Sequence, residues 1–142
     1  MKPLLAVLFA SLVGCASSVE PGPPQTDCGA THERVGWTAE LTGYFHDVAG
    51  TVEAVDDCTL ELRDFVFDGT GLNVRFVTST DSSFGSYTSL SDDLRQSGGY
   101  AGETLTLALT EGMTLDEVDF VSIWCVPADA NFGDGPLVAP IL

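Results

Sequence analysis

The chain has 142 residues, of which 21 are acidic and five are lysine or arginine, so its formal net charge is −16 at pH 7. This charge excludes nucleic acid as a partner, because binding to phosphate needs a basic patch. The length allows one domain with a hydrophobic core but not two. We interpret the acidity as a solvated surface suited to export.

The first fifteen residues have the pattern of a bacterial lipoprotein signal. Lys2 gives a short positive start, and residues 4–13 form an apolar stretch. This stretch is too short to span a bilayer, which needs about 20 apolar residues. The motif LVGC at residues 12–15 then fits a lipobox, in which small residues precede a cysteine that accepts diacylglycerol. The pattern predicts a signal peptide over 1–14 and lipidation of Cys15.

The mature chain is therefore expected to attach to a membrane outside the cytoplasm, since each buried lipid methylene contributes about 0.8 kcal/mol. Ala16, in place of Asp, follows the lipidated cysteine and favours the outer membrane over the inner one. An ordinary secretory signal with a chance cysteine at its end is the alternative. Residues 15–36 are rich in proline and predict an extended tether.

From Trp37 onward, short β-prone runs are separated by Gly, Asp and Asn, which predicts a single β-rich domain over 37–142. Residues 80–100 form a long excursion between strands, and residues 114–118 have the pattern of one helical turn. The expected strands are 38–46, 50–56, 58–67, 72–79, 103–110 and 119–126. The fold class is therefore all-β, an antiparallel β-sandwich or a barrel-like domain.

The alternation within these strands also orients two cysteines. Cys58 has the parity of Leu60, and Cys125 has the parity of Ile123, so both are expected to face the core. Disulfides persist in exported proteins. We therefore favour a Cys58–Cys125 disulfide, with a bridge from Cys28 in the tether, or a free Cys125, as the alternatives.

Several motifs of the domain point to one family. They are GYFHDVAGTV at 43–52, CTL at 58–60, FVFDG at 65–69, TLTL at 104–107, VSIWCV at 121–126 and NFG at 131–133. In this order they resemble the electron-transfer "DM thirteen" family, whose β-rich extracellular domains often stand beside DOMON domains. The resemblance implies a redox role centred on Cys125. The sequence GLN at 71–73 stands where many relatives have a Gly-Pro-Asp-type turn. We expect this departure to loosen the loop without reaching Cys125.

No cofactor or metal is predicted. DOMON relatives can bind haem through Met and His, which implies His46 with Met113 as the axial pair here, because His32 lies in the tether. The carboxylates that we considered as calcium ligands lack the spacing of a calcium loop, and no zinc motif occurs. These carboxylates are Asp64, Asp68, Asp92, Asp93, Asp116, Glu117 and Asp119.

Two functional hypotheses follow. The resemblance favours a membrane-anchored extracytoplasmic lipoprotein with an electron-transfer or thiol-redox domain, in which Cys125 is the redox group. The alternative is a non-catalytic surface module, which binds a protein partner or a glycan and uses its disulfide only for stability. The sequence names no donor, acceptor or ligand for either hypothesis.

Overall fold

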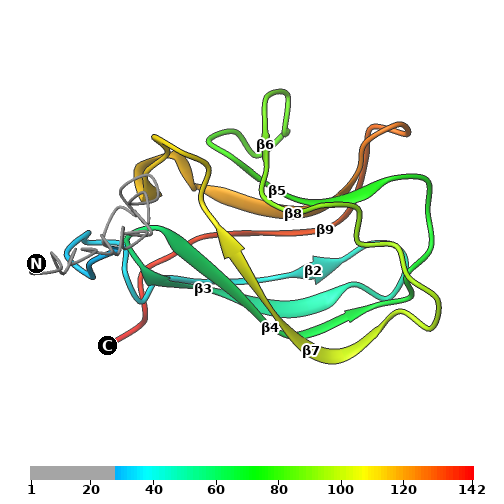
Figure 1. Ribbon diagram of the computed structural model, residues 1–142, viewed down its shortest axis with the longest axis horizontal. Coiled ribbons are helices and arrows are strands. Elements are labelled where there is room, and N and C mark those ends of the chain that lie inside the picture. The colour runs from blue at the N-terminus through cyan, green and yellow to red at the C-terminus, as the bar shows by residue number, and fades with distance from the viewer. Residues whose placement is uncertain (1–27) are drawn as a thin grey trace, which may run out of the picture.

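Two antiparallel sheets stack face to face in the computed structural model, which describes residues 28–142 (Figure 1). The first sheet has the order β1-β3-β4-β7 and the second β2-β9-β8-β5-β6. The first comprises β1 (Thr38–Glu40), β3 (Ala49–Asp56), β4 (Thr59–Phe67) and β7 (Tyr100–Ala108). The second comprises β2 (Thr42–Gly43), β5 (Val74–Ser79), β6 (Thr88–Ser89), β8 (Phe120–Cys125) and β9 (Ala130–Pro136). The predicted all-β antiparallel fold is confirmed.

The core lies between the two sheets and follows the alternation of the strands. In β4, Leu60 and Leu62 are fully buried, and so are Phe65 and Phe67, although the parity changes between the two pairs. A β-bulge accounts for the change, because the register with β7 shifts after Leu62. Each large side chain buried here contributes roughly 1.5–3 kcal/mol to folding.

The strand predicted at 38–46 is divided between the two sheets. β1 pairs with β3, whereas β2 pairs with β9. The chain leaves β2 at Gly43, and residues 44–48 form a loop in which His46 and Asp47 both have φ of 59°. The alternation of apolar residues over 38–46 predicted a single strand because it gives no sign that the chain passes from the first sheet to the second.

β9 was not predicted, because its sequence ANFGDGP contains residues that are depleted in strands. Its glycines are needed for close packing. A Cβ at Gly135 would lie 2.1 Å from the carbonyl oxygen of Glu40, and one at Gly133 would lie 2.5 Å from Val48 Cγ1. The glycines that lower the strand propensity of β9 are thus the residues that allow it to pack closely against Glu40 and Val48.

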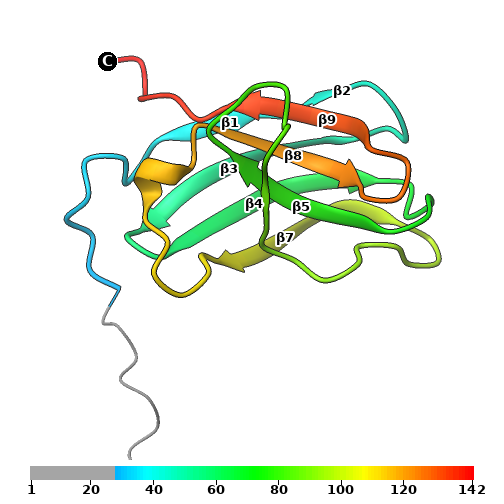
Figure 2. The ribbon, with the colours of Figure 1, turned by 90° about the horizontal axis from the view of Figure 1, so that it is seen from above.

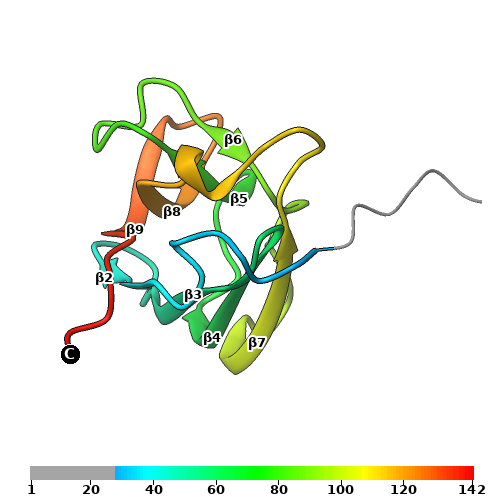
Figure 3. The same cartoon turned by 90° about the vertical axis from the view of Figure 1, so that its left-hand side faces the viewer.

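Residues 28–36, predicted as part of a tether, pack instead against the domain. The backbone N–H groups of Thr31 and His32 donate to the Asp57 carboxylate. Arg34 donates to the carbonyl oxygens of Leu115 and Val118, which belong to the helical turn η1 (Leu115–Glu117) and the residue after it. The helical turn expected at 114–118 is therefore present as this short 3-10 helix. Figure 3 shows the segment and η1 across one end of the sandwich.

Among residues 28–142, no helix is long and apolar enough to cross a membrane. The predicted signal peptide, the lipidation site Cys15 and residues 16–27 lie outside the described part of the chain.

Candidate functional site

The two ends of the sandwich differ in what they carry. The described chain begins and ends at one of them, which we call the terminal end (Figures 1 and 2). At the other, the loop end, four connections gather: β2–β3 (44–48), β4–β5 (68–73), β6–β7 (90–99) and β8–β9 (126–129). Cys125 is the last residue of β8 and lies at this loop end.

Cys125 is a core residue with 2% of its surface exposed. It faces inward with Val121 and Ile123, as the alternation predicted, and it pairs with Val74 of β5 and Ala130 of β9. Within residues 28–142 it is the free cysteine, because the other two are joined to each other. A buried thiol thus lies directly beneath the loops.

Backbone amides from two loops lower the pKa of the Cys125 thiol through hydrogen bonding. They are the N–H groups of Leu72 and Asn73, from the β4–β5 loop, and of Ala128, from the β8–β9 loop. Burial raises the pKa of the Cys125 thiol, but these donors and the positive charge of Arg95 lower it by more, so the pKa lies below its ordinary value of 9.0. The thiolate is the reactive form of cysteine. The arrangement can therefore hold a nucleophilic, oxidisable sulfur inside the fold.

Arg95 is held in place by Asp93. The Asp93 carboxylate accepts hydrogen bonds from Arg95 Nε at 2.7 Å and from the Val74 backbone N–H at 3.1 Å. Leu94, between them, is buried and donates its N–H to the Val74 carbonyl oxygen. Because Val74 is the strand partner of Cys125, this segment lies against the strand next to the thiol.

Two glycines join the β4–β5 loop to the β6–β7 loop. A Cβ on Gly69 would lie 2.8 Å from Gly99 Cα, and one on Gly99 would lie 2.2 Å from the carbonyl oxygen of Phe67. Both glycines have positive φ, of 78° and 64°. A surface cavity of about 590 Å³ opens between the loops, lined by parts of 68–71 and 93–98. The two loops therefore touch closely at these glycines and leave an open cavity beside the contact.

A family model described as electron transfer DM13 matches residues 40–137, which include Cys125 and all four loops of this end. The chain belongs to the electron-transfer DM13 family. Its relatives include Protein Skeletor, isoforms B/C and isoforms D/E, of Drosophila melanogaster, each 34% identical over 101 residues, or 66% of this chain. The match covers only 13% and 7% of those proteins, respectively. No solved structure gives a significant match.

The disulfide of this DM13 protein joins Cys28 to Cys58, so the predicted Cys58–Cys125 bridge was wrong. The alternation of residues placed Cys58 and Cys125 on inward faces, but it does not tell at which end of the sandwich each cysteine lies. Cys58 precedes β4 at the terminal end, and Cys125 ends β8 at the loop end. The nine residues of β4 span about 30 Å, whereas a disulfide needs Cα atoms within about 7 Å.

The prediction that residues 71–73 do not reach the thiol was also wrong. Leu72 and Asn73 supply two of the three amides that act on Cys125. A proline has no backbone N–H, so the Gly-Pro-Asp-type turn expected for many relatives would lack the donor that Leu72 provides here. The departure from the family pattern could have directed attention to this loop, but nothing in the sequence places the loop beside β8.

His46 and Met113 lie at opposite ends of the DM13 domain, so they cannot ligate one haem iron. His46 Nδ1 is 2.8 Å from Asp68 Oδ2 and 3.0 Å from Thr70 Oγ1 at the loop end. Met113 lines a cavity with Cys58 at the terminal end. The His46 ring instead packs against Phe132 in a tilted arrangement, with 4.2 Å between ring centroids.

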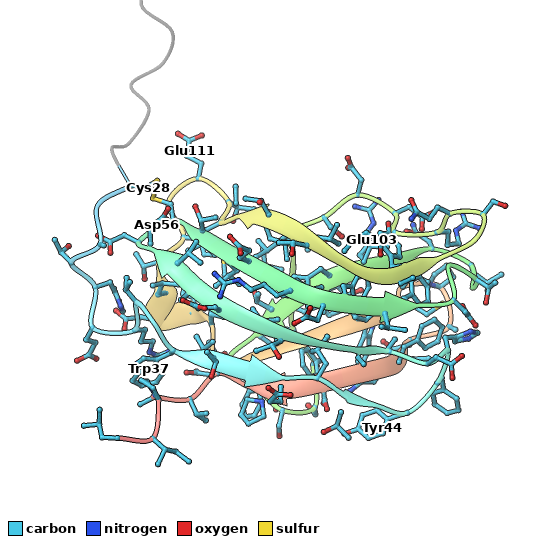
Figure 4. All side chains as sticks on the ribbon, turned by 90° about the horizontal axis from the view of Figure 1, so that it is seen from below. Cys28, Trp37, Tyr44, Asp56, Glu103 and Glu111 are labelled. Carbon is cyan, nitrogen blue, oxygen red and sulfur yellow. A yellow bond between two sulfur atoms is a disulfide. The ribbon has the colours of Figure 1, made fainter. Side chains whose placement is uncertain are left out.

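Several of the acidic residues considered as calcium ligands are paired with basic groups. Asp116 and Asp119 contact His32 and Arg34, respectively, and Asp68 contacts His46. Among residues 28–142, the group with metal-ligand spacing is Cys28, Asp56 and Cys58, two of which are labelled in Figure 4. Its two sulfurs are bonded to each other, so they are not thiolate ligands in this oxidised form.

Proposed function

We propose that this chain is a lipid-anchored, extracytoplasmic redox protein in which Cys125 of the DM13 domain is the reactive group. The single observation that carries the proposal is a free, buried cysteine at the end of β8, beneath the loops of the loop end. Three backbone N–H groups that lower the pKa of its thiol support it. Membership of an electron-transfer family gives independent support.

The absence of a neighbouring thiol defines the chemistry proposed. Within residues 28–142, Cys28 and Cys58 are paired at the far end of the domain, so Cys125 has no internal partner there. Its thiolate would attack one sulfur of an external disulfide, forming a mixed disulfide and releasing the other half as a thiolate. A donor thiolate then attacks the external sulfur of the mixed disulfide, which releases Cys125 as a thiolate and leaves a new external disulfide with one half exchanged. Two such exchanges, with two donor thiols, convert the original disulfide to two thiols and the two donor thiols to a disulfide. This transfers two electrons between the external partners and requires no bound cofactor.

Thiol exchange with a small disulfide tests this function. The full chain carrying Cys15→Ala is incubated with hydroxyethyl disulfide, and adducts are counted by intact-protein mass spectrometry. We expect one adduct, on Cys125, which forms faster as the pH rises through the thiol pKa and is removed by dithiothreitol. Cys125→Ser in the same background should form none.

The non-catalytic surface module is the second candidate, and the 2% exposure of Cys125 favours it. If Cys125 forms the adduct only as fast as the whole domain unfolds, measured by hydrogen exchange under the same conditions, the thiol is structural. That result would contradict the redox proposal and support the alternative.

We propose further that Cys15 anchors the chain, in the outer membrane of a double-membraned cell, as the LVGC motif and Ala16 suggest. Cys15→Ala should abolish lipidation and leave uncleaved precursor or released protein in cell fractionation. A variant that is processed normally and stays on membranes after carbonate washing would contradict the anchor.

A further inference from the structure

We propose that an exposed apolar patch at the loop end, formed by Tyr44, Phe45 and Leu72, is the docking surface for a redox protein whose own apolar contact is ringed by lysine and arginine. This tip patch rests on the proposed function, since it names the partner of the same site.

The exposure of these side chains is the first support. Tyr44, Phe45 and Leu72 are 54%, 60% and 61% exposed, respectively. Among residues 28–142, the other large apolar side chains with such exposure belong to the C-terminal segment from Val138 onward. Single exposed apolar residues are ordinary, but a group of them indicates an interaction site. Figure 4 shows Tyr44 at the end opposite Cys28.

The two loops that carry the patch both pack against Phe132. The Phe45 and Phe132 rings make an edge contact with centroids 6.4 Å apart. Gly71, which precedes Leu72, lies so close that a Cβ there would be 3.3 Å from Phe132 Cε2. The N–H groups of Tyr44 and Phe45 both donate to the Phe132 carbonyl oxygen, at 2.9 and 3.1 Å. The patch is therefore held in shape before a partner arrives, which lowers the entropic cost of docking.

Leu72 connects the patch to the thiol. Its backbone N–H acts on the Cys125 sulfur, while its side chain extends into solvent. Leu72 precedes Asn73, whose carbonyl oxygen accepts a hydrogen bond from the N–H of Val126, the residue after Cys125. A partner that covers Leu72 would therefore dock over the loop that adjoins the thiol and would exclude water from it.

The negative charge around the patch favours a basic partner protein over a second copy of this chain. The four loops of this end carry five aspartates, Asp47, Asp68, Asp92, Asp93 and Asp129, and a single arginine, Arg95. A second copy would bring the same excess of negative charge, on a chain of net charge −16, and would be repelled. A basic partner would be attracted, and weak docking steered by charge is typical of electron-transfer complexes.

Binding of ferric cytochrome c, a basic protein with lysines around an exposed apolar haem edge, tests the surface. The full chain carrying Cys15→Ala is titrated with this probe by NMR at low and high salt. We expect binding at low salt that weakens as screening increases. Phe45→Ser with Leu72→Ser should weaken it by about tenfold or more, as loss of central apolar contacts does. Val138→Ser, at an exposed apolar residue outside the loop end, should bind like the parent.

Three results would overturn the docking surface: no binding by the parent at low salt, equal weakening by Val138→Ser, or no weakening by the double variant. Self-association that the double variant abolishes, measured by sedimentation without the probe, would assign the patch to a second copy instead. Cys125→Ser keeps the patch and should bind the probe normally. If the parent binds the probe but its Cys125 does not exchange with hydroxyethyl disulfide, the docking surface stands and the redox proposal falls. If the parent exchanges but does not bind the probe, only the docking surface falls.

Discussion

Cys125 is a residue on which burial and hydrogen bonding act in opposite directions. Burial raises the pKa of the thiol, and the amides of the two neighbouring loops, with Arg95, lower it by a larger amount. The amides belong to the backbone and keep their positions when surface side chains change. A low thiol pKa in this fold therefore depends on loop conformation more than on any one side chain.

This balance predicts how stability depends on pH. A folded pKa below the unfolded value stabilises the fold fully above the unfolded pKa, and the contribution is lost as the pH falls through the folded pKa. Relative to Cys125→Ser, the parent should therefore gain free energy of unfolding as the pH rises toward about 9. Urea denaturation of both proteins at a series of pH values measures this difference in the free energy of unfolding. Parallel curves for the two proteins would show that the thiol pKa is the same folded and unfolded.

Gly98 and Gly99 offer a matched pair to test whether the contact between the β4–β5 and β6–β7 loops controls access to Cys125. Both have positive φ, so alanine costs roughly 1–2 kcal/mol of backbone strain at either position. A Cβ on Gly98 meets nothing within 4 Å, whereas one on Gly99 meets the Phe67 carbonyl oxygen. Gly99→Ala should thus force the loops apart and speed alkylation of Cys125, and Gly98→Ala should not. Equal rates in both variants would mean that the loop contact does not control access.

At the level of elements, alternation predicted the strands whose side chains divide cleanly between core and solvent. β4 on either side of its bulge, and the second half of β7, where Leu105 and Leu107 alternate with exposed threonines, show this division, and both strands lie close to their expected positions. β9 was not predicted because its close packing against Val48 and Glu40 requires glycine, a residue with low strand propensity. The folded segment 28–36 was not predicted because its hydrogen bonds to the domain are made with Asp57 and η1, which are distant in sequence.

The Cys28–Cys58 disulfide fixes that segment to the turn before β4, across a sequence separation of 30 residues. Closing a loop of this length restricts the unfolded chain by about 3–4 kcal/mol in the entropy model. Cys28→Ser with Cys58→Ser should lower the free energy of unfolding by about this amount, measured by urea denaturation. Cys125→Ser keeps the bridge and serves as the control. An unchanged unfolding midpoint in the double variant would contradict this role.

At the level of the whole molecule, the domain separates its cysteines by end. The terminal end carries the disulfide and the start of the described chain, and the loop end carries the thiol, its amides and the tip patch (Figure 1). The sequence indicated that Cys125 faces inward and that the domain resembles a redox family. It could not indicate which cysteines meet, because parity assigns a residue to a face, and only the topology assigns it to an end.

The central claim is that backbone amides lower the pKa of the Cys125 thiol in the folded domain, and a titration of the thiolate ultraviolet absorbance tests it most directly. The full chain carrying Cys15→Ala is titrated folded and in urea. We predict a folded midpoint below the unfolded one. Leu72→Pro, which removes one N–H donor, should raise that midpoint, and Leu72→Ala, which keeps the donor, should not. Circular dichroism checks that both variants are folded. A folded midpoint at or above that of the unfolded chain would contradict the account.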